Sequence, residues 1–217
     1  MRHTLPFLLI ALSLVACSPN VQADIYEQCD SAIAKWNADE KVTNAQMGAC
    51  LQVADQGNVQ AMLSLGVVYV KGLGVEKNLE KAVEWFAKAA LTGNVNGQYN
   101  LGLAYAKGNG VTKDLAKAAH YFRLAAEQND SGAQYNLGVM YAVGEGLQKD
   151  PIQAYAWLDI AARNGYEGAA EGRDDVGGQF SAEQLKQVQA IESDVLRKVK
   201  MPSSASSAAT NATDQSL

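Results

Sequence analysis

The sequence is poor in the residues from which most catalytic sites are built. It contains only two histidines, His3 and His120, and no pattern of cysteine, aspartate or serine accompanies the second of them. No spacing typical of metal ligands occurs. None of the roles of an active site is therefore filled, and we expect no enzymatic activity, no cofactor and no metal.

Clustered positive charge and long apolar runs are also scarce. Lysine and arginine number 18 against 23 aspartates and glutamates, without a long cationic run. This argues against nucleic acid as a partner, because its phosphates need clustered cations. The apolar run from Leu5 to Val15 is too short for a typical transmembrane helix. Because it follows Arg2 and precedes small residues, it indicates a secretory signal peptide rather than a buried helix.

The end of this segment resembles a bacterial lipobox. Residues 14–17 read Leu-Val-Ala-Cys, a pattern in which the signal peptide, here residues 1–16, is removed and the cysteine is lipidated. Cys17 would then be the first residue of a lipoprotein. Ser18 rather than an aspartate follows it, which favours the outer membrane, with the protein facing the periplasm.

A second cleavage site competes with the lipobox. Residues 21–23, Val-Gln-Ala, resemble the site of ordinary signal peptidase, which would remove residues 1–23 and yield a soluble periplasmic or secreted protein. Either route exports the chain. The remaining cysteines, Cys29 and Cys50, would then lie in an oxidising compartment.

These two cysteines are predicted to be joined. Apolar residues at helical spacing indicate one helix over residues 24–37 and a second over 43–57, with a turn centred near residue 40. Cys29 and Cys50 lie about equally far from that turn, so an antiparallel hairpin would bring them to one height. We expect a disulfide rather than two free thiols. Closing a loop of this size contributes about 3 kcal/mol in the chain-entropy model.

Glycine is concentrated at positions that recur every 36 residues. The phrase YVKGLGVEKN at 69–78 returns as YAKGNGVTKD at 105–114 and as YAVGEGLQKD at 141–150, and Leu-Gly pairs recur at the same interval. A fixed period of this size is typical of a helical array. A phosphate-binding loop is expected once and after a strand, so we interpret these glycines as turns.

Each repeat is predicted to be a pair of helices, helix A followed by helix B. In the first repeat, helix A covers residues 59–71 and helix B covers 79–91, each with apolar residues on one face. Gly72 can end helix A in a left-handed conformation. Gly66 lies in the middle of helix A, where glycine costs about 1 kcal/mol relative to alanine. Its recurrence implies a close contact between helices.

The stretch AQYNLGVMYAVGEGLQKDPIQAYAWLDIAARNG, residues 133–165, resembles a Sel1-like repeat, a relative of the tetratricopeptide repeat. Three copies cover residues 61–96, 97–132 and 133–168, and a degenerate half-copy lies within the N-terminal hairpin, 24–58. The resemblance implies an all-α fold, an α-solenoid of antiparallel helix pairs. An array of this kind needs covered ends.

The C-terminal part departs from the repeat. Residues 169–201 begin like a fourth helix A but carry Arg173-Asp174 in place of Leu-Gly, which indicates a decayed repeat. A separate helix over 181–200 has capping-box spacing at its start and an apolar stripe. We expect it to cap one end of the array as the N-terminal hairpin caps the other. Residues 202–217 are small and polar and are predicted to be disordered.

The resemblance also implies a working surface, because the A helices of such arrays usually line the concave side. Each inward-facing position of the tetratricopeptide repeat can be matched to a residue of this sequence. The matched residues are Leu63, Val67, Lys71, Tyr99, Asn100, Leu103, Lys107, Tyr135, Asn136, Val139 and Val143. Tyrosine and asparagine beside aliphatic residues suit a protein or peptide partner. Tyr99 and Tyr135 could instead pack between repeats, and the sequence does not decide between these roles.

The resemblance therefore favours a non-enzymatic adaptor of the bacterial cell envelope that binds another envelope protein or peptide and is held to the membrane by its N-terminal lipid. Two alternatives remain. Some members of the family are associated with β-lactam or cell-wall peptide chemistry, although the Ser-x-x-Lys pair that such chemistry generally uses is absent from this sequence. The chain could also be a fixed structural subunit of a polysaccharide-export or secretion complex.

Overall fold

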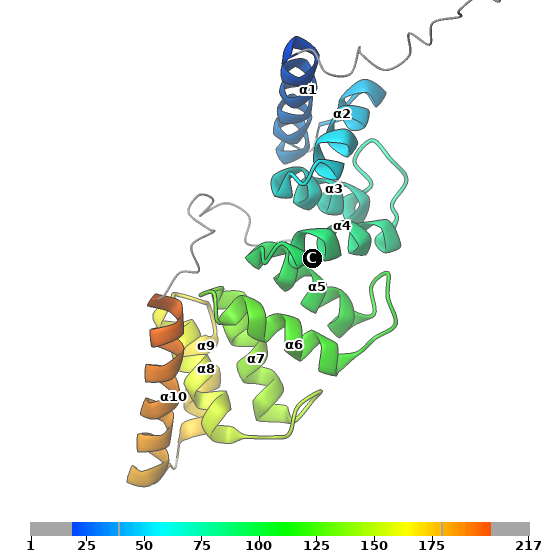
Figure 1. The fold of residues 1–217 in the computed structure, drawn as a ribbon. Coiled ribbons are helices and arrows are strands. Elements are labelled where there is room, and N and C mark those ends of the chain that lie inside the picture. The colour runs from blue at the N-terminus through cyan, green and yellow to red at the C-terminus, as the bar shows by residue number, and fades with distance from the viewer. Residues whose placement is uncertain (1–18, 39, 179, 201–217) are drawn as a thin grey trace, which may run out of the picture. The chain divides into compact units, whose positions relative to one another are not determined.

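The computed structural model describes residues 19–38, 40–178 and 180–200, and within these ranges the chain folds into ten α-helices without a strand. The predicted all-α class is therefore confirmed. The signal segment 1–16, Cys17 and the tail 202–217 lie outside the described residues. The helices follow one another in antiparallel pairs (Figure 1) and form two compact units that divide between Thr92 and Gly93.

The first unit contains four helices around one core. They are α1 (Pro19–Asn37), α2 (Asn44–Asp55), α3 (Val59–Lys71) and α4 (Leu79–Leu91). The first two helices form the predicted hairpin, although α1 begins at Pro19 instead of residue 24. The other two coincide with helices A and B of the first repeat. Apolar side chains from all four helices share the core, among them Trp36, Val53, Leu65 and Phe86.

A disulfide joins α1 to α2. Cys29 and Cys50 are bonded, with 4.5 Å between their Cα atoms, and both side chains are buried in the core that the hairpin shares with α3. Because solvent does not reach it, the bond is a structural crosslink and not an accessible redox group.

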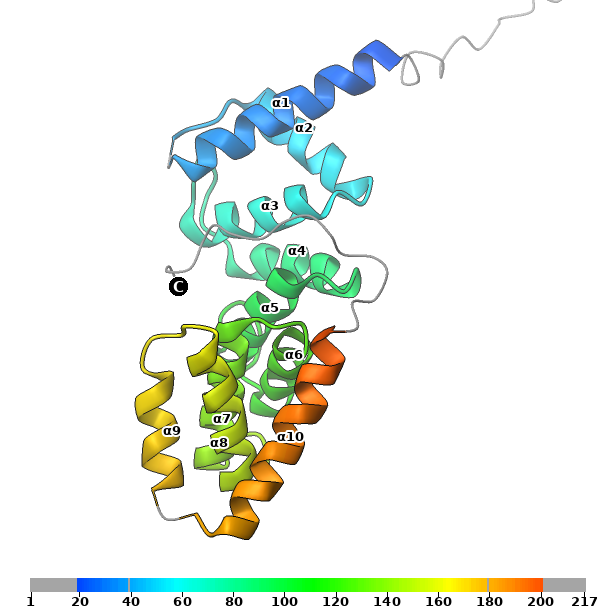
Figure 2. The ribbon, with the colours of Figure 1, turned by 90° about the vertical axis from the view of Figure 1, so that its left-hand side faces the viewer.

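The second unit contains the other two repeats and two further helices. They are α5 (Val95–Lys107), α6 (Leu115–Ala126), α7 (Ser131–Val143), α8 (Pro151–Arg163), α9 (Ala169–Gly177) and α10 (Ala182–Lys200). The short α9 falls where the sequence starts like a fourth helix A. Both α9 and α10 pack on α8 (Figure 2). Val188 and Val195 of α10 are buried there, so the apolar stripe of this helix faces α8 and its neighbours.

Side chains and glycines fix the ends of the repeat helices. All six helices begin after a residue whose side-chain oxygen accepts a hydrogen bond from a backbone N–H in the first turn, which satisfies a donor that the helix leaves open. These residues are Asn58, Asn78, Asn94, Asp114, Asp130 and Asp150. Gly72, Gly108 and Gly144 end the A helices with φ of 75°, 75° and 83°. The glycines are therefore turn residues, as the repeat predicted.

A close contact joins helix A to helix B in every repeat. A glycine in the middle of helix A lies against a large side chain of helix B. The pairs are Gly66 with Phe86, Gly102 with Phe122, and Gly138 with Leu158. A Cβ atom added at Gly102 would lie 2.8 Å from the Phe122 ring, closer than van der Waals contact allows. The absence of a side chain is thus what lets the two helices approach.

We expect Gly66→Ala to destabilise the first unit by about 1–2 kcal/mol. The added methyl group would overlap Phe86, whose ring is buried, and overpacking of this kind outweighs the gain of about 1 kcal/mol from replacing a helical glycine.

The matched control is Gly48→Ala in α2. Apart from its chain neighbours and the backbone of its own helix, no atom lies within 4 Å of a Cβ atom at that position, so this change should stabilise the unit by about 0.5–1 kcal/mol. Thermal melts of the two variants should shift in opposite directions. A higher melting temperature for Gly66→Ala would contradict the proposed role of the contact.

Candidate functional site

The residues predicted to face a partner lie in three rows, one on each helix A. Within a row they are spaced four residues apart, so they line one side of the helix. The rows are Leu63, Val67 and Lys71 on α3 in the first unit, and Tyr99, Leu103 and Lys107 on α5 with Tyr135, Val139 and Val143 on α7 in the second. The structure leaves part of each row exposed and uses the rest in packing.

Tyr99 and Tyr135 contact neighbouring elements through their rings. The Tyr99 ring lies 5.9 Å from that of Phe122 on α6, and it also lies against Gly132 at the start of α7. Tyr135 stacks on Tyr166, which follows α8, with 4.7 Å between ring centroids. Both tyrosines are half-buried. They make the packing contacts that the sequence left open.

The polar residues of the predicted surface are held differently. Asn100 donates a 2.9 Å hydrogen bond, and Asn136 a 2.8 Å bond, to the backbone carbonyl oxygen four residues earlier in the same helix. These bonds fix the orientation of both amides on the helix surface. Lys71 and Lys107 are exposed at the C-terminal ends of α3 and α5.

Part of the exposed surface of the rows is aliphatic. Val67 on α3 is 39% exposed, and Val139 and Val143 on α7 are 36% and 59% exposed. Leu63 and Leu103 are half-buried and pack against the cores of their own units. Helix α7 therefore presents the largest exposed apolar row, and Val143 stands where the other two A helices end in lysine.

A pair of buried amides that the sequence alone did not predict links the repeat helices of the second unit. Gln98 on α5 is 5% exposed and Gln134 on α7 is fully buried. Gln128, after α6, donates a 2.8 Å bond to Gln98, and Asn164, after α8, donates a 2.8 Å bond to Gln134. A buried amide without a hydrogen-bond partner would lower the free energy of unfolding by about 1–3 kcal/mol. Each pair therefore specifies where the segment after helix B docks on helix A of the same repeat. The sequence signal was a column of glutamine where Met62 stands in the first repeat.

Asn129 belongs to the same arrangement. It has φ of 72°, the only positive value for a non-glycine residue in the described part of the chain. It stands where the neighbouring repeats have Gly93 and Gly165, and asparagine tolerates this conformation better than most residues. Its side-chain oxygen accepts hydrogen bonds from Gln134 and Asn164. Asparagine in place of glycine therefore adds a hydrogen-bond acceptor between α6 and α7.

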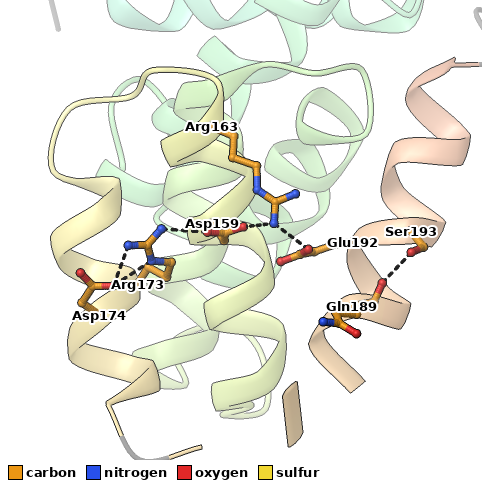
Figure 3. Close-up of polar contacts among 7 residues, drawn as sticks. All are labelled: Asp159, Arg163, Arg173, Asp174, Gln189, Glu192 and Ser193. Carbon is orange, nitrogen blue, oxygen red and sulfur yellow. Dashed lines mark hydrogen bonds and ion pairs between the residues drawn. The ribbon is translucent and has the colours of Figure 1, made fainter. Parts of the chain in front are cut away.

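A network of five charged side chains fastens α9 and α10 to α8 (Figure 3). Asp159 on α8 is 7% exposed and pairs with Arg163 one turn later. Its other oxygen lies 2.9 Å from Arg173 of α9, which also binds Asp174. Arg163 reaches Glu192 of α10 at 2.8 Å. In the sequence, Arg173-Asp174 stands out because it replaces the Leu-Gly pair of the repeat. The ion pairs that these residues form could not be predicted, because they depend on how α9 packs on α8.

The network shifts the pKa values of its members. Burial raises the pKa of Glu192, against the opposing effect of the hydrogen bond from Arg163. The hydrogen bond to Glu192 raises the pKa of Arg163, and the hydrogen bond to Asp159 raises that of Arg173. Both arginines therefore stay charged, while the carboxyl group of Glu192 takes up a proton more readily than an exposed glutamate does.

The second unit also contains a half-open cavity of about 350 Å³ between α10 and helices α6 to α8. Its lining includes Arg123 and Glu127 from α6, Tyr141 from α7, Trp157 from α8 and Asp194 from α10. Arg123 donates a 2.6 Å hydrogen bond to the Tyr141 hydroxyl. No sequence pattern indicates this site, because four separate helices contribute to it.

Other chemistry has little support in the described part of the chain. His120 is exposed and contacts only the edge of the Tyr121 ring among aromatic groups, at 5.3 Å between centroids. Residues 19–38, 40–178 and 180–200 contain no group of three histidine, cysteine or acidic side chains placed to hold a metal ion. None of the helices described there combines the length and the apolar character of a membrane span.

Comparisons with known proteins bear on the repeat. Residues 59–94, 95–130 and 131–166 match the profile of the Sel1 repeat. The chain is similar to the crystal structure of a protective antigen present in uropathogenic Escherichia coli strains that displays an SLR fold. The two are 31% identical over 89% of this chain and 44% of that chain, with a TM-score of 0.70. This chain therefore spans less than half of the antigen.

A second solved structure is similar over more of its own length. It is a Sel1 repeat protein from Oxalobacter formigenes, 30% identical over 79% of this chain and 72% of that chain, with a TM-score of 0.63. The search of curated proteins found no match. The architecture therefore has clear relatives, while the comparisons assign no partner to this chain.

We expect Glu192 to give the stability of the second unit a distinct pH dependence. Because its pKa is raised in the folded state, protonation of Glu192 favours folding, and this contribution is lost as pH rises through the folded pKa. The stability of wild type relative to Glu192→Gln should therefore fall as pH rises above the ordinary glutamate pKa of about 4.3. Denaturant titrations at a series of pH values measure the difference. The control is Glu183→Gln, the same substitution at an exposed position of α10. A rising difference for Glu192→Gln would show that pairing with Arg163 outweighs burial.

Proposed function

This chain belongs to the Sel1 repeat family, whose repeats generally form protein-interaction scaffolds, and from this premise we propose that it is a non-enzymatic adaptor of the bacterial cell envelope. It binds another envelope protein or peptide through the side of its A helices that the family resemblance places on the concave face. No cofactor, metal or nucleic acid takes part in this proposal. The proposed surface consists of the three rows on α3, α5 and α7 with Asn100 and Asn136.

The exposed aliphatic row of α7 carries the proposal. Val139 and Val143 lie one helical turn apart and keep 36% and 59% of their surface in solvent, although both are apolar. The Tyr99 ring reaches the start of α7, so the rows of α5 and α7 are neighbours within the second unit. Lys107, exposed at the end of α5, adds a positive charge. A partner with aliphatic side chains and a nearby acidic group would match these features.

We expect Val139→Asp combined with Val143→Asp to abolish partner capture while changing stability by about 0.5 kcal/mol or less per exposed site. A photo-crosslinking residue at position 143, introduced in living cells, should capture a defined envelope protein that the double variant no longer retains. The matched control is position 185 on α10, where Leu185 is 41% exposed. Capture from position 185 but not from 143, or undiminished capture by the double variant, would show that the partner binds elsewhere.

We further propose that the protein is exported and anchored at the outer membrane through a lipidated Cys17. The buried disulfide supports an extracytoplasmic location, because such bonds persist in oxidising compartments. The position of α1 supports the lipobox over the alternative site. Cleavage before Cys17 would leave α1 whole, whereas cleavage after Ala23 would remove its first turn and the 2.7 Å hydrogen bond from Gln22 to Gln56.

We expect Cys17→Ala to convert a membrane-bound protein into a soluble one. Without the cysteine no acyl chain can be attached, so the apolar anchor is lost. Fractionation of cells that express each form measures the change, and the intact mass of the wild type identifies its first residue. A wild-type mass that begins at Asp24 without acyl chains would refute the anchor and leave the adaptor proposal standing.

A further inference from the structure

The third repeat differs from the others in how its tyrosine meets a cation. In the first two repeats a lysine near the start of helix B lies over the tyrosine of helix A. Lys81 lies 5.4 Å from the Tyr69 ring centroid, and Lys117 lies 5.1 Å from that of Tyr105. The third repeat has Gln153 at the position of these lysines. A short neutral side chain therefore stands where the repeat otherwise places a long cationic one.

A different cation covers the third tyrosine. The guanidinium carbon of Arg123, from the preceding helix B, lies 5.7 Å from the Tyr141 ring centroid, and the same side chain hydrogen-bonds the Tyr141 hydroxyl. Gln153, Arg123 and Tyr141 all line the half-open 350 Å³ cavity that α10 borders. The cavity thus coincides with the missing lysine, and its arginine is oriented by a fixed partner.

The lining combines apolar surface with both signs of charge. Trp157, Ile191 and Val195 provide apolar surface, Arg123 is positive, and Glu127 and Asp194 are negative. The bond to Tyr141 uses one of the five N–H donors of Arg123. Asp194 also binds Arg197 at 2.5 Å, and both Asp194 and Glu127 make further interactions. A carboxylate has several acceptor positions and can bind two cations at once.

We propose that this cavity binds a zwitterionic amino acid or dipeptide with an apolar side chain. The ligand carboxylate pairs with Arg123, its ammonium group with Glu127 and Asp194, and its side chain lies on Trp157. The two acidic residues disfavour a purely anionic ligand, and the three charges disfavour an uncharged one. A volume of about 350 Å³ lies at the lower end of the range for small-molecule sites, roughly 300–1,000 Å³, which suits a ligand of this size.

Calorimetric titration of the full-length protein tests the proposal with three probes: L-leucine, L-leucylglycine and N-acetyl-L-leucinamide, which lacks both charges. We expect the amide not to bind. Binding of leucine identifies an amino-acid site, and binding of leucylglycine alone identifies a dipeptide site. Binding of the uncharged amide as tightly as the others, or no binding of any probe at about 10 mM, a concentration at which even a millimolar site would be mostly filled, would overturn the proposal.

Two variants locate the binding. Arg123→Gln should weaken it by about tenfold to a hundredfold, since a hydrogen bond to a charged group is lost. Gln153→Lys restores the lysine of the other repeats and should fill the cavity, which abolishes binding with little change in melting temperature. Lys117→Gln makes an equivalent change over Tyr105, outside the cavity, and should leave the affinity unchanged. Wild-type affinity in both Arg123→Gln and Gln153→Lys would overturn the assignment to this cavity.

Discussion

The close contact between helix A and helix B is the constraint on which each repeat depends. Phe86, Phe122 and Leu158 can lie against the facing helix because the residue opposite them is glycine. Two helices held so near each other need a reversal of fixed geometry, and a left-handed glycine at the end of helix A begins it. With one side of helix A committed to this contact, residues on its other side remain for packing between repeats or for a partner.

The contacts between helices of the second unit use polar groups as well as apolar packing. The pairs of Gln128 with Gln98 and Asn164 with Gln134 place buried amides between helices. Such groups tolerate few alternative arrangements, because an unpaired buried amide is costly. The charged network around Asp159 does the same for α9 and α10. Desolvation offsets much of the attraction in buried ion pairs of this kind, so they add little net stability, but their geometry specifies where the helices dock.

The residues that hold each repeat together are therefore distinct from the residues exposed on its surface. The glycine contacts and caps recur in each repeat, whereas the side chains on the exposed rows differ, with Lys71 and Lys107 in two repeats and Val143 in the third. Function in such a fold resides in sites placed on a common scaffold. We propose two such sites in the second unit: an exposed aliphatic row on α7, and a small charged cavity beside α10.

The sequence by itself determined the helix pairs, their boundaries in the first repeat, the turns and the pairing of Cys29 with Cys50, because all of these follow from spacing along the chain. It also identified the rows of helix A, since residues four apart share a side. Tertiary structure alone decided that Tyr135 stacks on Tyr166 while Val143 stays exposed. It alone brought Arg123 and Trp157 to one cavity, and Arg163 to Glu192. Those contacts join residues on different helices, and their existence depends on how the helices pack, which no local period encodes.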